Sequence, residues 1–289
     1  MFNSSLNPIS PSPIVILEPT SDGYTIICKG DTCQFSLNQV AKQLHKTIVK
    51  VQEFFLETFS LKGIDGRGKL EPFVINWDER NAQWFCKSES CFWRFHNIYA
   101  MTPEVVAHEY MHGVIKNLNY LTYSFQSGAL NESLADVIGI AFKQWLSPEL
   151  DSKNRWSMGG LRDFSSHASM LNYSHQHIEE DFGGVHTNSA IPNHAFYRAT
   201  VTYKSIRLMA QIWFISFLQA DHNSTFNKFA QKTIETAKKI DPSHNSAIHI
   251  MKAWNHVGVL QVESEENFLE ISDQFSRKQI VKTIIHTYA

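Results

Sequence analysis

The spacing of apolar residues divides the chain into a strand-rich first part and a mainly helical remainder. Between Gln39 and Phe59, apolar residues recur every three to four positions with charged residues between them, which predicts an amphipathic helix. The stretches 14–35 and 70–95 instead consist of short apolar runs broken by turn residues, which predicts strands and hairpins. Residues 63–68, rich in glycine, predict a turn between the helix and the second group of strands.

Helical spacing dominates after Thr102, where Pro103 stands at the first position of a predicted helix. Ser224 is the expected N-cap of a later helix, and Gly258 is expected to end the last one. Strands followed by helices predict an α+β protein with a strand-rich N-terminal lobe and a mainly helical C-terminal lobe. The predicted helices cover residues 103–118, 130–145, 203–220, 224–240 and 244–256.

These patterns divide the chain into four parts. Residues 1–36 contain a lead-in and short strands, and residues 37–120 form an N-terminal α+β lobe that includes helix 103–118. Residues 121–259 form the helical C-terminal lobe. Residues 260–289 form a C-terminal extension. Three roles remain open for it: a cap on the C-terminal lobe, a docking or export signal, or a loosely ordered tail.

Composition narrows the classes of partner. Lys and Arg total 26 and Asp and Glu total 28, so the formal net charge is −2 and no polybasic field is available for nucleic acid or an anionic membrane. The most apolar stretch, 208–218, is too short to span a bilayer. The first residues lack the features of a secretory signal peptide, so we expect a cytoplasmic protein or one exported without such a peptide.

The four cysteines form two copies of the pattern C-x4-C. Each pair lies between strand-like runs and is expected to flank a four-residue hairpin turn that brings the two sulfur atoms close together. Three interpretations remain open: unpaired strand cysteines, cross-hairpin disulfides in an oxidising compartment, and one shared four-thiolate zinc site. The residues are Cys28, Cys33, Cys86 and Cys91.

Histidine is the residue type whose count stands out, with 14 in 289 residues. His108 and His112 lie four positions apart in the predicted helix 103–118, so both imidazoles leave the same face. That arrangement suits two ligands of one tetrahedral zinc ion, and Glu109 beside them suits a general base acting on a water that the metal acidifies. The alternative is a pair of surface histidines with no metal.

The next helix offers two carboxylates on one face. Glu132 and Asp136 are four positions apart on a helix that is otherwise mostly apolar. They are either its solvated side, or a zinc ligand and a carboxylate that orients a ligating histidine.

At this point the sequence resembles the thermolysin family of zinc metalloproteases. The stretches His108–His112, Gly128–Asp136, Gly183–Ser189 and Ala253–Val259 reproduce the order of the family's motifs and nearly their spacing. The resemblance implies the two-lobed thermolysin-like fold, with the zinc helix between the lobes, and covers roughly three quarters of the chain.

The resemblance also implies roles for individual residues. His108, His112 and Glu132 would bind one catalytic Zn²⁺, with Asp136 hydrogen-bonded to His108. Glu109 would be the general base, Tyr123 and His186 would donate to the oxyanion, and Asp181 would orient His186.

Substrate contacts follow from the same resemblance. Arg162 would bind the substrate carbonyl just after the scissile bond, and Asn81 and Ala82 would pair with the extended substrate backbone. Val105 and Leu161 would line an apolar pocket, so the enzyme is expected to cut before bulky hydrophobic residues.

One departure from the family concerns calcium. Secreted members bind it through acids that follow the second helix, whereas this chain has Lys143 on that helix and few carboxylates in residues 154–160. We therefore expect zinc but not calcium. The expected activity is a zinc endopeptidase that acts on peptides or proteins. The alternatives are a zinc exopeptidase of aminopeptidase type and a catalytically idle binding protein on the same scaffold.

Overall fold

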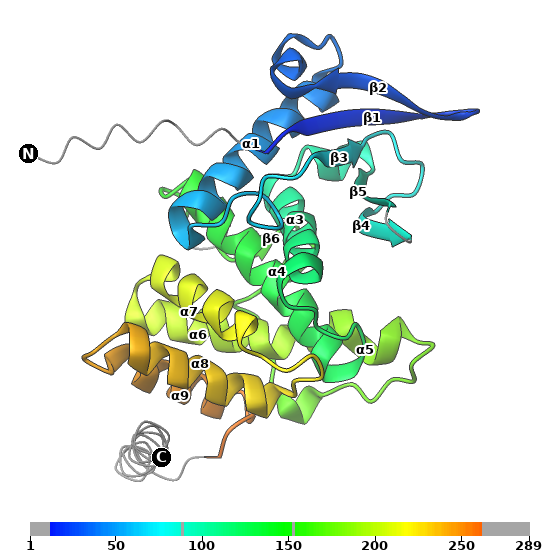
Figure 1. Ribbon diagram of the computed structural model, residues 1–289. Coiled ribbons are helices and arrows are strands. Elements are labelled where there is room, and N and C mark those ends of the chain that lie inside the picture. The colour runs from blue at the N-terminus through cyan, green and yellow to red at the C-terminus, as the bar shows by residue number, and fades with distance from the viewer. Residues whose placement is uncertain (1–11, 88–89, 152–153, 262–289) are drawn as a thin grey trace, which may run out of the picture.

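The structure is a computed structural model that describes residues 12–87, 90–151 and 154–261. Figure 1 shows a sheet and one long helix in the upper half of the view and a layer of helices in the lower half. Helices α3 (Pro103–Leu118) and α4 (Phe125–Leu146) run between them. The described part of the chain thus has the α+β architecture in two lobes that the sequence pattern predicts. The predicted lead-in 1–11 and almost all of the extension 260–289 lie outside the described residues.

The N-terminal lobe is built on one mixed sheet of five strands in the order β2-β1-β3-β5-β4. The two hairpins, β1–β2 and β4–β5, are antiparallel, whereas β3 pairs in parallel with β1 and β5. Strand β4 is therefore one edge of the sheet. The strands are β1 (Ile14–Thr20), β2 (Gly23–Lys29), β3 (Glu71–Val74), β4 (Ala82–Lys87) and β5 (Ser90–Phe95).

Helix α1 (Gln39–Phe59) has the predicted bounds. Asn38 caps its N-terminus by accepting a hydrogen bond of 3.1 Å from the backbone N–H of Ala41. Its apolar stripe, which includes Leu44, Ile48 and Phe55, is fully buried against the rest of the lobe. Burial of this stripe is the main reason for the stability of the helix, because isolated helices in water are marginal.

The described residues of the C-terminal lobe form five further helices. Helices α6 to α9 form the lower layer of the view in Figure 1, and α5 lies at one end of α4. Short elements in this region are the hairpin of β6 (Ser157–Met158) and β7 (Arg162–Asp163) and the 3-10 turn η2 (Met170–Asn172). The helices are α5 (Asp181–Asn188), α6 (Ala190–Tyr203), α7 (Ile206–Leu218), α8 (Phe226–Ile240) and α9 (Asn245–His256), and the four-residue α2 (Asn97–Ala100) precedes α3.

The predicted helix 203–220 is wrong at its start. Tyr203 ends α6, Lys204 has a left-handed backbone with φ of 65°, and Ser205 caps α7 by accepting from the N–H of Leu208. Helix α6 itself was not predicted, because it is buried on most sides and lacks a clear apolar stripe. The predicted helix 130–145 begins earlier, at Phe125, and Thr225 rather than Ser224 caps α8.

One predicted hairpin is also wrong. Cys28 ends up near the end of β2, but Cys33 lies in the 3-10 helix η1 (Gly30–Phe35) rather than in a strand. The other pair matches the prediction, because Cys86 and Cys91 face each other across the antiparallel β4–β5 hairpin. The structure joins Cys28 to Cys33 and Cys86 to Cys91 as disulfides.

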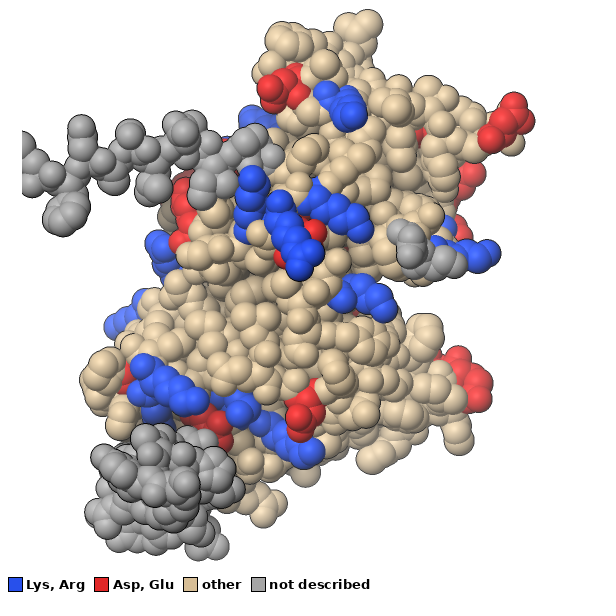
Figure 2. All heavy atoms as spheres, in the orientation of Figure 1, with Lys and Arg blue, Asp and Glu red and all other residues tan. Residues whose placement is uncertain are grey.

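The surface carries charges of both signs. On the face drawn in Figure 2, Lys and Arg side chains lie among Asp and Glu and among large uncharged areas. Among the described residues, no helix is long and apolar enough to cross a bilayer.

Candidate active site

Three potential metal ligands meet where α3 crosses α4. The Nε2 atoms of His108 and His112 lie 3.1 Å apart, since the two residues occupy successive turns of α3. Across from them, Glu132 of α4 places Oε2 at 3.6 Å from His108 Nε2 and Oε1 at 3.4 Å from His112 Nε2. Three donors bound at about 2.0–2.1 Å to a tetrahedral zinc ion lie about 3.3 Å from one another, so the observed separations between the three side chains suit this metal.

The proton positions on the two histidines support a cation at this point. His108 Nδ1 lies 2.8 Å from Oδ1 of Asp136, and His112 Nδ1 lies 2.9 Å from Oδ1 of Asn131. Both oxygens only accept, so in the neutral imidazoles each Nδ1 carries the proton and each Nε2 presents a lone pair. Two lone pairs and a carboxylate that face one another at short range repel unless a cation lies between them.

Asp136 is fully buried, yet it is ionised. Burial alone would raise the pKa of its carboxyl group, but the Arg162 guanidinium and the His108 imidazole lower that pKa to about 2. Arg162 Nε lies 2.7 Å from Oδ2 of Asp136, and the side-chain amide of Asn193 donates to the same oxygen at 2.7 Å. The buried charge of Asp136 is therefore partnered by an imidazole, a guanidinium and an amide.

Charges around Glu132 act in the same direction. Its burial would raise the pKa of its carboxyl group, but His112, His108, His186 and Arg162 together hold that pKa below its ordinary value. Glu132 is consequently an anion, which is the form that binds a metal ion.

Two further side chains, those of Tyr123 and His186, lie close to Glu132. The Tyr123 hydroxyl donates to Oε1 of Glu132, and it lies 3.3 Å from Nε2 of His186. Asp181 accepts a hydrogen bond of 3.0 Å from the backbone N–H of His186 and also contacts Nδ1 of its ring. Because that carboxylate accepts, Nδ1 carries the proton in the neutral imidazole. The structure thus brings together four residues to which the resemblance assigns roles: Tyr123, Glu132, Asp181 and His186.

An unusual turn holds His186 in place. The first four residues of α5, Asp181 to Gly184, all have left-handed backbone angles, with φ between 50° and 84°. Asp181 and Phe182 are non-glycine residues, for which this conformation is unfavourable, so the surrounding contacts must impose it. Such local strain is common at functional sites.

Gly128 allows α4 to approach this turn closely. A Cβ atom at this position would lie 2.4 Å from Cγ1 of Val185 and 2.9 Å from the carbonyl carbon of Tyr123. No real Cβ contact is that short. The missing side chain therefore allows the segments that carry Tyr123 and Val185 to lie this close to α4.

Glu109 is fixed by the neighbouring strand. The backbone N–H of Trp84 in β4 donates to its Oε2 at 2.8 Å, and the indole N–H of Trp93 donates to its backbone carbonyl at 2.8 Å. Its Oε1 lies 4.0 Å from Nε2 of His108. The carboxylate is thus held beside the ligand triangle without being part of it.

These groups open into one cleft between the lobes, with a volume of about 660 Å³. Its lining includes residues of the edge strand β4 and of the β6–β7 hairpin. Val105 is a buried part of this lining, whereas Leu161 is 57% exposed. All of the residues expected to bind substrate line this cleft: Asn81, Ala82, Val105, Leu161 and Arg162.

Three groups of the site were not predicted from the sequence. The backbone N–H of Trp84 and the side chain of Asn193 act through tertiary contacts that no spacing reveals. Asn131 immediately precedes Glu132, and its place one residue before a potential ligand is a signal that could have been used.

Comparison with known proteins agrees with this geometry. The family model described as thermolysin metallopeptidase, alpha-helical domain, matches residues 119–259. An extracellular metalloprotease of Pectobacterium carotovorum subsp. carotovorum is 30% identical over 253 residues, covering 75% of this chain and 71% of that protein. Neutral protease NprE of Bacillus pumilus is 28% identical over 240 residues, covering 78% of each chain.

The fold is also found among solved structures. The precursor of protealysin, a metalloproteinase from Serratia proteamaculans, superimposes with a TM-score of 0.73 over 87% of this chain and 88% of that chain, at 23% identity. From the identity and coverage of its relatives, the chain belongs to the thermolysin family of metallopeptidases and is a zinc metalloendopeptidase.

Proposed function

We propose that His108, His112 and Glu132 hold one catalytic Zn²⁺ and that Asp136 orients His108 by accepting its Nδ1 proton. When bound, zinc supplies a Lewis acid that acidifies water and polarises a peptide carbonyl. The observation that carries this proposal is the convergence of the donor atoms: the two Nε2 atoms lie 3.1 Å apart, and the nearest Glu132 oxygens lie 3.4 and 3.6 Å from them.

Glu109 is the proposed general base. Its carboxylate accepts the proton of the attacking water and then delivers that proton to the leaving amine. The Trp84 N–H binds Oε2 only, which leaves Oε1 directed to the side of His108 for this proton transfer.

Tyr123 and His186 are the proposed donors to the oxyanion of the tetrahedral intermediate. Both side chains face the same point above Glu132, and Asp181 holds the proton of His186 on Nδ1. Donation from Nε2 uses the doubly protonated ring, whose Nδ1 proton the Asp181 carboxylate accepts. Burial raises the pKa of Tyr123 well above its ordinary value, so its hydroxyl keeps its proton.

The edge strand β4 is the proposed binding site for the substrate backbone. An extended peptide can pair with an open strand edge, and Asn81 and Ala82 stand where β4 enters the cleft. The proposed specificity is for a bulky hydrophobic residue after the cut, because the apolar side chains of Val105, Met158 and Leu161 line the cleft beside Arg162.

Calcium independence is a further part of this proposal. The ammonium group of Lys143 lies 2.9 Å from Oε1 of Glu104 and donates to the carbonyl of Ser157 at 2.7 Å. Oxygen atoms of this kind are calcium ligands, but here a side-chain cation already compensates them.

The two disulfides support action outside the reducing cytosol. Disulfides persist in oxidising compartments, and one relative is named an extracellular metalloprotease. We therefore favour the exported form of the two locations that the sequence left open.

The substitution Glu109→Gln tests the mechanism. The amide has nearly the size of the carboxylate and can still accept from the Trp84 N–H, but it cannot act as a base. Casein digestion should therefore fall to background, while the zinc content per chain stays unchanged. The matched control is Glu235→Gln on the exposed face of α8, which should leave digestion intact. Undiminished proteolysis by the Glu109 variant would exclude this carboxylate as the base.

A further inference from the structure

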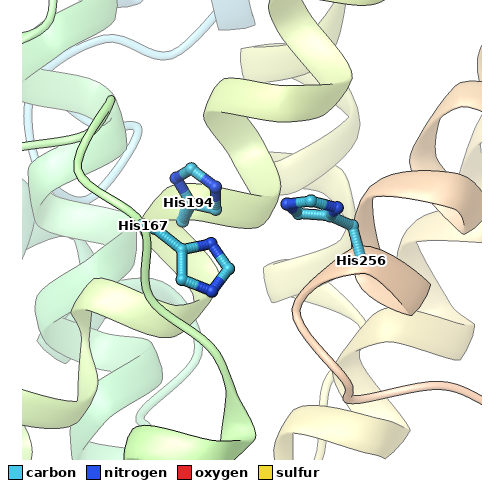
Figure 3. A group of neighbouring side chains, drawn as sticks. All are labelled: His167, His194 and His256. Atoms are coloured by element: carbon cyan, nitrogen blue, oxygen red, sulfur yellow. The ribbon is translucent and has the colours of Figure 1, made fainter.

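Three histidines outside the cleft converge from distant parts of the chain (Figure 3). His167 lies in the loop after β7, His194 lies in α6, and His256 is the last residue of α9. One potential ligand atom from each lies within 4.8 Å of the other two. Among the described residues, only this group and the active-site triangle bring three potential metal ligands so close together.

The three rings form a nearly equilateral triangle. Their centroids are 5.4 Å apart for His167 and His194, 5.6 Å for His167 and His256, and 5.7 Å for His194 and His256. Three imidazoles bound to one tetrahedral zinc ion at about 2.0–2.1 Å have ring centroids about 5 Å apart. A metal ion thus requires only small movements, and two of the three side chains are exposed and free to make them.

The proton on His194 is placed as in metal sites. Its Nδ1 lies 3.0 Å from the backbone carbonyl of Phe164, and a carbonyl only accepts, so Nδ1 carries the proton and Nε2 presents a lone pair. Ligating histidines commonly donate their other N–H to a carbonyl in this way. Phe164 belongs to the loop that also supplies His167, so one segment provides a ligand and orients another.

Two fixed features of the fold act on a cation at this cluster. The Arg198 guanidinium lies close enough to interact with both His194 and His256. The same guanidinium opposes a dication, whereas the C-terminal end of α9, where His256 lies, attracts one. These opposed effects indicate a site of moderate affinity.

We propose that His167, His194 and His256 form a second metal site, which binds a divalent transition metal ion of the Zn²⁺ class. Three neutral nitrogen donors suit zinc, copper or nickel, whereas magnesium and calcium require oxygen donors. The ion would connect α6, α9 and the loop 164–169, next to the hydrogen bond of 2.8 Å from the N–H of Met170 to the carbonyl of Val257. Its role is to hold α9 on the lobe.

The test separates this site from the active site by counting zinc in the full-length protein after equilibration with micromolar zinc chloride. The wild type should bind two zinc ions per chain, and His112→Ala should bind one. His256→Ala and His167→Ala should each also bind one ion but keep full casein digestion. His177→Ala, which removes an exposed histidine of the same lobe, is the matched control and should bind two.

Stability gives a second readout that does not depend on activity. Zinc should raise the Tm of His112→Ala, and the added change His256→Ala should abolish that increase and weaken the second binding event by about 100-fold or more. His256→Asn, which keeps a polar side chain, serves if the alanine variant folds poorly. One zinc per wild-type chain, with no effect of His256→Ala on either readout, would show that the three rings are a packing cluster only.

Discussion

The backbone N–H of Trp84 donates a hydrogen bond of 2.8 Å to Oε2 of Glu109. The strand that forms one wall of the cleft therefore also positions the proposed base. Because β4 is an edge strand, this N–H points away from β5 and toward α3. The proposed substrate strand and the proposed base thus meet at one strand, β4.

We expect Glu109→Asp to lose turnover although it retains the negative charge. The side chain is shorter by one methylene group, so the carboxylate cannot both accept from Trp84 and reach the attacking water. A displacement of about 1 Å costs roughly 100-fold in rate, so kcat should fall by about that factor or more. Zinc content and Tm are the controls and should stay at their wild-type values; an unchanged kcat would show that position of the carboxylate is not limiting.

Tyr123→Phe should lower kcat by about 100-fold with little change in KM, because it removes one donor to a charge that develops only in the transition state. The ring, which packs at 5.3 Å from Phe182, is retained in this variant. Steady-state kinetics on a blocked peptide measures both constants. An increase in KM alone would mean that Tyr123 contacts substrate in its ground state instead.

Asp136→Asn should weaken zinc binding by about 10- to 100-fold, since it removes the anion that holds the proton on Nδ1 of His108. It also leaves the buried part of Arg162 without its closest partner, so some loss of stability should accompany it. Competition with a chelator measures the affinity. Asn193→Ala, which removes only the amide contact to Asp136, is the control and should weaken zinc binding less. Equal zinc affinities of the wild type and Asp136→Asn would contradict the proposed role of this carboxylate.

Glu71 should make the stability depend on pH. Burial raises the pKa of this carboxyl group to about 7, although hydrogen bonds from Tyr110 and Gln52 oppose the shift. The folded state therefore binds the proton more tightly than the unfolded state, so the stabilisation is complete below the unfolded pKa of about 4.5 and is lost as pH rises to about 7. The shift corresponds to about 3 kcal/mol.

Glu71→Gln is the matched test, because the amide resembles the protonated acid and the buried Oε1 of Gln52 can accept from it. Urea unfolding of this variant should show a smaller loss of free energy between pH 5 and pH 7 than the wild type. Glu235→Gln, on the surface of α8, should retain the wild-type slope. Identical slopes in all three proteins would contradict the raised pKa.

Calcium should not change the stability of the zinc-loaded enzyme. Lys143 already provides a cation to Glu104 and to the carbonyl of Ser157, and the Gly159 N–H donates to the same Glu104 oxygen at 3.1 Å. The Tm should be the same with calcium and with a calcium-selective chelator, while Lys143→Met should lower it because Glu104 then loses its partner. A calcium-dependent Tm in the wild type would overturn this expectation.

The sequence predicts a helix correctly where the spacing of its apolar residues marks the face that the folded protein buries. Helix α1 and helix α3 have the predicted bounds, since each carries clear end signals and a regular apolar pattern. Helix α6 is buried on most sides, so no stripe marks it, and the left-handed turn at Asp181 and Phe182 contradicts local preference. Local patterns could not predict either feature.

For the site, the ligand triangle was found because His108 and His112 share one helix face and the Glu132 motif lies at a fixed distance in the sequence. Trp84 and Asn193 were not found, because they reach Glu109 and Asp136 from elements that meet only in the folded chain. A sequence reveals ligands on one helix more readily than the groups that support them from other elements.

Gly128 has a consequence for how substitutions in this enzyme are interpreted. It makes no contact with substrate in the proposed mechanism, yet a single added methyl group would collide with both Val185 and Tyr123. The two segments that carry Tyr123 and His186 would separate, and the proposed oxyanion donors with them. Inactivating variants should therefore occur at a position that a survey of cleft-lining residues omits, and the affected enzyme would still bind zinc.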